Sequence, residues 1–98
     1  MDYKNIYILG IGGSGMSSIG KYLKQKELNV IGYDQRKSYI TNLLKQDGID
    51  VVFSESDIPY DKNNLYIFSS AIPIESDKFL ELHDKENVIS RPEFLKNL

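Results

Sequence analysis

Gly10-Ile11-Gly12-Gly13-Ser14-Gly15-Met16-Ser17 is the stretch that decides the fold, because four glycines fall between an apolar run and the start of a helical pattern. The run before it, residues 5–9 (Asn-Ile-Tyr-Ile-Leu), is short, branched and aromatic, which is typical of a buried parallel strand. After it, Met16, Ile19 and Leu23 follow one another at helical spacing. The glycines therefore predict a turn that joins a strand to a helix.

Three of these glycines, Gly10, Gly12 and Gly15, match the pattern G-x-G-x-x-G. In that pattern the first glycine permits a tight turn, the second lets the backbone approach a pyrophosphate, and the third lets the helix pack closely on the strand. The amides and the dipole of the helix then face the anion. We therefore predict a phosphate or nucleotide site, the alternative being glycines that only tighten the packing of helix on strand.

Strands and helices are expected to alternate along the rest of the chain. Further strands are predicted at residues 29–33, 51–53, 65–68 and 88–89, and further helices at 38–47, at 76–85 and from 90 onward. Such alternation requires parallel strands joined by right-handed crossovers. The fold class predicted is α/β, a Rossmann-like doubly wound parallel five-stranded sheet of order 3-2-1-4-5.

Serines are expected to begin three of the helices. Ser38 and Ser76 are predicted N-caps, and Gly48 is a predicted stop for the helix that Ser38 begins. The stretch Ser90-Arg91-Pro92-Glu93 has the form of a capping box with proline in the first turn. The chain stops at Leu98, about two turns into this last helix, so we expect a fragment of a larger protein.

A sheet of this order binds ligands beyond the carboxyl ends of its strands, at the switch point between strands one and four. This places residues 10–17, Asp34 and the loop 69–72 at one site. Asp34 ends the second strand, 19 residues after Gly15, and its carboxylate can accept hydrogen bonds from ribose hydroxyls or a base N–H. The loop offers small side chains that leave room for a flat ring. The alternatives are that Asp34 is only a solvated acid and that residues 69–72 are only a polar loop.

Composition excludes several functional classes. The chain has 98 residues, 41% of them hydrophobic, which suits one small domain. With 12 basic and 14 acidic residues and no basic cluster, it is a poor candidate for binding nucleic acid. It has no cysteine and a single histidine, His83, which argues against disulfides, thiol catalysis and a metal site. Its apolar runs are too short for a membrane span, so we expect a cytoplasmic protein.

A second motif overlaps the first. Residues 15–21 satisfy G-x-x-x-x-G-K, the opening of an ATP-binding P-loop. That loop needs Ser or Thr next to hold Mg²⁺, whereas Tyr22 follows here, and its Gly-Lys pair belongs at the junction of loop and helix. We therefore interpret Lys21 as a solvated helix residue.

Four ordered motifs make the whole chain resemble the N-terminal domain of the Mur ligases. They are the glycine stretch 10–17, Gly-x-Asp at 32–34, Ser-Ser-Ala-Ile-Pro at 69–73 and Arg-x-Glu-x-Leu at 91–95. The nearest members are those that join L-alanine to UDP-N-acetylmuramate and those that attach a murein tripeptide. One departure is Ser54-Glu55, which stands where Gly-His is common.

The resemblance implies a domain that holds the UDP of UDP-N-acetylmuramate during peptidoglycan synthesis. ATP and Mg²⁺ would bind in a central domain, and the remaining ligase domains would be partners in cis, so this chain alone has no catalytic residue and no cofactor of its own. The implied diphosphate contacts are Gly12, Gly13, Ser14, Gly15, Met16 and Ser17. The implied uridine contacts are Asp34, Ser69, Ser70, Ala71 and Ile72.

Two other functions remain open at this point. Arg36 and Lys37 follow Asp34 and could meet a 2′-phosphate, so an NAD(P)-binding domain of an oxidoreductase or regulatory subunit is one alternative. A nucleotide-sensing interaction module with no enzyme attached is the other.

Overall fold

The computed structural model of the chain describes residues 2–70, 72 and 75–98, and its strands form one parallel sheet of order β3-β2-β1-β4-β5. The predicted fold class and strand order are confirmed. The strands are β1 (Ile6–Leu9), β2 (Val30–Tyr33), β3 (Asp50–Val52), β4 (Leu65–Phe68) and β5 (Val88–Ser90). The helices are α1 (Ser14–Gln25), α2 (Tyr39–Gln46), the short 3₁₀ turn η1 (Glu55–Asp57), α3 (Asp77–Leu82) and α4 (Arg91–Lys96).

Alternate residues of each strand point to opposite faces of the sheet. In β1, Ile6 and Ile8 join one core cluster, whereas Tyr7 and Leu9 join another. The first cluster, which we call the aliphatic face, also holds side chains from α1, α2 and α4. The second, which we call the tyrosine face, is covered by Leu82 of α3 and by Ile58. The buried tyrosines of this face are Tyr7, Tyr33 and Tyr66.

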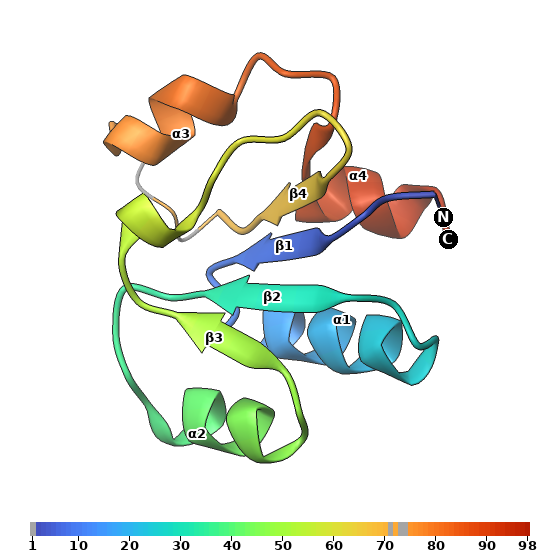
Figure 1. Cartoon of the computed structure of the whole chain (residues 1–98), viewed down its shortest axis with the longest axis vertical. Coiled ribbons are helices and arrows are strands. Elements are labelled where there is room, and N and C mark those ends of the chain that lie inside the picture. Colours follow the sequence, from blue (N-terminus) through green and yellow to red (C-terminus); the bar gives the residue numbers. More distant parts are fainter. Residues whose placement is uncertain (1, 71, 73–74) are drawn as a thin grey trace.

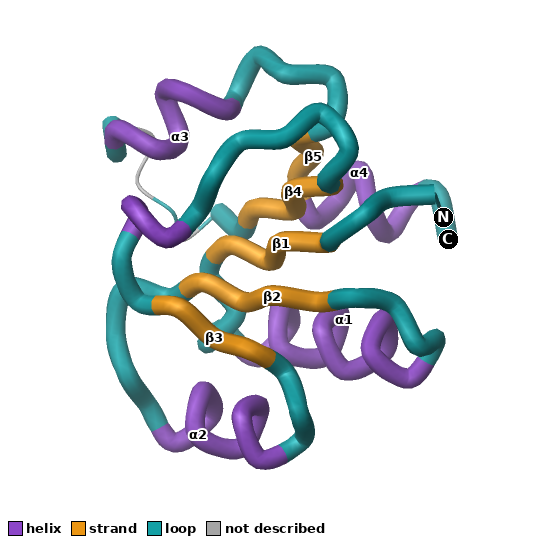
Figure 2. The backbone as a smooth tube through the Cα atoms, viewed as in Figure 1, coloured by secondary structure: helices purple, strands orange, loops and turns teal. Residues whose placement is uncertain are grey.

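The labelled strands run in the same direction, so their carboxyl ends share one edge of the sheet, where η1 and α3 lie (Figure 1). Figure 2 shows the loops that gather at this edge, including those that leave β1, β2 and β3. The edge therefore collects the residues that follow each strand, as the strand order predicts.

The serine caps form largely as predicted. The Ser38 hydroxyl accepts a hydrogen bond from the Thr41 amide, and the Thr41 hydroxyl accepts one from the Ser38 amide, which completes a capping box. Ser76 caps α3 by accepting from the Phe79 amide, and Gly48 has a φ of +85° at the end of α2. At α4 only half of the predicted box forms. The Glu93 amide donates to the Ser90 hydroxyl, but the Glu93 carboxylate accepts from that same hydroxyl and not from the Ser90 backbone amide.

The predicted extent of α3 is wrong at its carboxyl end, since the helix ends at Leu82 and not near Lys85. The Lys85 amide donates to the Leu82 carbonyl (3.0 Å), which is the spacing of a tight turn and not of an α-helix. With only Leu82 fully buried, α3 has little apolar surface to hold a further turn.

Candidate functional site at the carboxyl edge of the sheet

Residues 10–13 form the turn between β1 and α1, which we call the glycine turn, and hydrogen bonds join it to the end of β2. The amides of Gly10 and Ile11 both donate to the Tyr33 carbonyl, at 2.8 and 2.9 Å. Gly10 has a φ of +89°, a conformation that favours glycine, and a Cβ there would lie 2.5 Å from the Ser69 hydroxyl oxygen. The tight turn predicted for the first glycine is confirmed.

The amino end of α1 has no side-chain cap. Its N-cap is Gly13, and its first turn contains no acidic residue. The Ser17 amide makes the first bond of the helix, to the Gly13 carbonyl (2.8 Å), so the amides of residues 14–16 have no intrahelical acceptor. In the described part of the chain every other helix has a serine side chain at this position. Amides left in this way, at the positive end of a helix dipole, favour an anion.

The close approach of helix and strand is made by Gly20 and not by the third glycine of the motif. A Cβ on Gly20 would lie 3.2 Å from the Ile11 side chain and 3.6 Å from Ile8. A Cβ on Gly15 would instead meet the Arg91 guanidinium, with three of its atoms at 3.0 Å. Gly15 therefore leaves room for the Arg91 side chain of α4 beside the first turn of α1.

Asp34 supports the glycine turn directly. Its Oδ2 accepts from the Gly12 amide (2.8 Å) and its Oδ1 from the Arg36 amide (3.0 Å). A Cβ on Gly12 would lie 2.6 Å from Oδ2, so the missing side chain at Gly12 makes room for this carboxylate. Sequence reasoning assigned Asp34 to a ligand and overlooked its contacts with the protein backbone.

A cavity of about 360 Å³ lies at the carboxyl ends of β1 and β2, within the size range of small-molecule sites. Its lining contains apolar side chains and also charged side chains of both signs. The apolar lining is Leu9, Tyr33, Ile58, Ile72 and Phe79. The charged lining is Asp34, Arg36, Glu55, Glu75 and Lys78, and Gly10 and Gly13 connect the cavity to the glycine turn.

The predicted diphosphate residues lie together, at the end of the glycine turn and in the first turn of α1, but not all of them are exposed. Ser14 and Gly13 are exposed and Gly12 and Gly15 are half-buried. The Met16 side chain packs in the aliphatic face, and the Ser17 hydroxyl donates to the Ser14 carbonyl (2.9 Å). Backbone amides and the exposed Ser14 side chain are therefore the groups that this segment can offer to a ligand.

Of the residues predicted to contact uridine, the structure places only some at the cavity. Asp34 and Ile72 line the cavity, Ser69 is buried against Gly10, and Ser70 is exposed. Ala71 lies outside the described residues.

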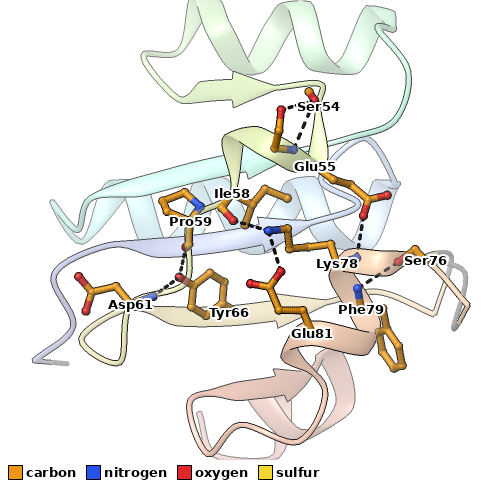
Figure 3. A network of polar contacts seen from close by, with 11 residues as sticks. Ser54, Glu55, Ile58, Pro59, Asp61, Tyr66, Ser76, Lys78, Phe79 and Glu81 are labelled. Carbon is orange, nitrogen blue, oxygen red and sulfur yellow. Dashed lines mark hydrogen bonds and ion pairs between the residues drawn. The ribbon is translucent and has the colours of Figure 1, made fainter.

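Sequence reasoning missed the wall that η1 and α3 provide. The Glu55 Oε1 accepts from the Lys78 amide (2.8 Å), and the Lys78 Nζ donates to the Ile58 carbonyl (2.8 Å) and pairs with Glu81 (3.2 Å), as Figure 3 shows. These contacts hold α3 against η1 beside the cavity. The signal in the sequence was weaker than for Asp34, because Asp34 directly follows β2, whereas Glu55 follows the end of β3 only after Phe53 and Ser54.

The pKa of Tyr33 is affected by the charges that line the cavity. Burial raises the pKa of Tyr33 above its ordinary value of 10.0, and the nearby carboxylates of Glu55 and Asp34 raise it further. The phenol therefore stays neutral at physiological pH, and the two carboxylates are the charges that act on it.

The P-loop-like stretch lies within α1, with Lys21 exposed in the middle of the helix. It therefore does not form a phosphate loop, in agreement with the interpretation from the sequence. No helix in the described ranges is long and apolar enough to cross a bilayer.

Together these features define a doubly wound α/β domain with a glycine turn and a cavity at the carboxyl ends of its strands. The model of the Mur ligase family, catalytic domain, matches residues 5–98, and the chain belongs to this family. A UDP-N-acetylmuramate–L-alanine ligase of Campylobacter jejuni is 37% identical over 94% of this chain, and one of Flavobacterium johnsoniae is 41% identical over 71%.

The fold also matches a solved structure. The crystal structure of UDP-N-acetylmuramate-alanine ligase MurC from Thermotoga maritima superposes with a TM-score of 0.79 over 95% of this chain, at 23% identity. The chain spans 22% of that protein and of the Campylobacter relative, and 17% of the Flavobacterium one.

Proposed function

We propose that this chain is the part of a UDP-N-acetylmuramate–L-alanine ligase that binds the UDP moiety of the substrate, in the cytoplasm. The observation that carries the proposal is the 37% identity, over 94% of this chain, to a relative of that name. The glycine turn, with an uncapped helix end beside a cavity of suitable size, supports it.

The division of labour within the site follows from its chemistry. The backbone amides at the amino end of α1 would receive the diphosphate, because they are donors at a positive helix end. The cavity would receive the nucleoside, because its apolar wall suits a flat ring. Asp34 would act mainly by holding the turn through the Gly12 amide.

Ligation itself is assigned to other parts of the enzyme. ATP and Mg²⁺ would bind in further ligase domains. There ATP would phosphorylate the substrate carboxylate, and the L-alanine amine would then attack the acyl phosphate and displace inorganic phosphate. This chain would bind the nucleotide end of the substrate while those domains act on the other end. On its own it is expected to form no amide bond.

The test is a titration of the ¹⁵N-labelled chain followed by NMR, with UDP-N-acetylmuramate and UDP against NAD and NADP. We expect the two UDP ligands to bind more tightly, with Kd between tens of micromolar and millimolar, roughly −6 to −4 kcal/mol. Shifts should concentrate at the amides of residues 12–17 and around the cavity. Tighter binding of NAD at the same amides would favour an oxidoreductase domain instead.

A further inference from the structure

The cavity wall contains two half-buried carboxylates, Asp34 and Glu55, that differ in what they already bind. Both oxygens of Asp34 accept a backbone amide. Glu55 accepts one amide, that of Lys78, through Oε1. In the described part of the chain no hydrogen bond or ion pair involves its Oε2. Of the two side chains, Glu55 has the free acceptor.

The position of Glu55 is set by the protein and does not depend on a ligand. The bond from the Lys78 amide holds Oε1 at the first turn of α3, and the Lys78 ammonium is directed to Ile58 and Glu81 instead of to Glu55 (Figure 3). The carboxylate is therefore anchored at one oxygen without being neutralised by that lysine. An anchored acceptor binds a ligand at a smaller cost than a mobile one, since little freedom is lost when it binds.

The surroundings of Glu55 suit a flat heterocycle. Tyr33, Ile58 and Phe79 line the same cavity and provide aromatic and aliphatic surface. An ionised carboxylate can only accept hydrogen bonds, so the ring that it binds must present an N–H. Uracil presents N3–H between two carbonyl groups, whereas cytosine has a lone pair at N3.

We propose that Glu55 is a specificity-determining residue that accepts the N3–H of uracil and thereby selects uridine nucleotides over cytidine nucleotides. This inference rests on the proposed function, because the diphosphate at the glycine turn must hold the ribose and with it the ring. With the ring so held, cytosine would place its N3 lone pair against the carboxylate. A site that must leave such groups unpaired rejects the wrong ligand strongly.

The experiment compares Kd values for UDP and CDP by calorimetry or NMR, in the wild type and in Glu55→Gln. Glutamine keeps an oxygen for the Lys78 amide but directs an N–H₂ group toward the ring. We expect the wild type to favour UDP by about tenfold or more, and Glu55→Gln to reduce that ratio to about threefold or less. The readout is a ratio, so a general loss of structure does not imitate the result.

Glu75→Gln is the matched control, because it removes one negative charge from the same cavity lining. Either substitution lessens the repulsion of a diphosphate, but that effect is equal for UDP and CDP. We expect Glu75→Gln to leave the UDP to CDP ratio unchanged. An equal fall in that ratio for both variants would overturn the proposal, because it would assign the selectivity to charge alone.

A ligand-side probe needs no variant. UDP methylated at N3 has no N–H at this position, and we expect the wild type to bind it about tenfold or more weakly than UDP. Equal binding of UDP, its N3-methyl derivative and CDP would overturn the role of Glu55 while leaving UDP binding intact. No binding of UDP or UDP-N-acetylmuramate to the wild type would overturn the proposed function and this inference with it.

Discussion

The two faces of the sheet differ in how they are covered. On the aliphatic face, α1, α2 and α4 pack apolar side chains against the strands. On the tyrosine face a single short helix and the segment around Ile58 lie over phenol rings, held in part by hydrogen bonds. The cavity opens beside this second cover. Both faces are buried, but on the face that carries the candidate site hydrogen bonds add to burial in holding the cover in place.

Truncation on the aliphatic face should have the largest effect. Leu23 of α1 is 0% exposed, and Leu23→Ala removes methyl groups that packed neighbours cannot replace. We expect the free energy of unfolding to fall by about 2–5 kcal/mol in urea titrations. Leu80→Ala, at a leucine of α3 that is 54% exposed, is the control and should change stability by less than about 0.5 kcal/mol. Equal losses would mean that the burial of Leu23 in this face does not determine the effect.

Loss of one hydroxyl should destabilise the tyrosine face. The Tyr66 hydroxyl accepts from the Asp61 amide (3.0 Å) and from the Asn64 side chain (3.1 Å), and it donates to the Pro59 carbonyl. Tyr66→Phe leaves these groups without a partner, so we expect a loss of about 1–3 kcal/mol by urea titration. Tyr39→Phe, at a tyrosine that is 76% exposed, should be neutral. A neutral Tyr66→Phe would mean that the hydrogen bonds of this hydroxyl add nothing to burial on this face.

The sequence predicted the aliphatic face better than the tyrosine face. Regular patterns such as Met16, Ile19 and Leu23 determine where strands and helices pack, and the strand order follows from their alternation. The end of α3 was predicted wrongly because its stop depends on a local turn at Lys85 with no glycine or proline to mark it.

The candidate site was predictable in position but not in detail. The glycine turn and Asp34 carry local signals, and the carboxyl ends of parallel strands must share an edge. The contact between Glu55 and the Lys78 amide joins residues 23 positions apart, through a loop whose path the pattern does not specify. The Gly12 to Asp34 bond was missed for the same reason, since it spans 22 positions.

A methyl group on Gly12 tests how the turn depends on Asp34. In Gly12→Ala the new Cβ would lie 2.6 Å from Oδ2, so the carboxylate must rotate away and release the Gly12 amide. We expect UDP affinity to fall by about tenfold or more, or about 1.4 kcal/mol, in the NMR titration. Gly13→Ala is the matched control, because its Cβ would make only an ordinary contact at 3.5 Å with the Gly10 carbonyl. Unchanged UDP affinity in Gly12→Ala would show that the turn does not need this contact.

The smallest loss of stability is expected when the serine caps of α2 and α3 are removed, and the two losses should appear in different measurements. Ser38→Ala and Ser76→Ala each remove a hydroxyl that accepts a hydrogen bond from a helix amide, at 3.2 and 3.1 Å. Loss of such a cap typically lowers the free energy of unfolding by about 1 kcal/mol. Because Leu44 of α2 is 0% exposed in the aliphatic face, the loss in Ser38→Ala should appear in global unfolding. For α3, held by a few polar contacts, the loss in Ser76→Ala should appear mainly as faster hydrogen exchange of its own amides. Equal shifts of both urea midpoints, with unchanged exchange in α3, would show that this helix unfolds only with the rest of the chain.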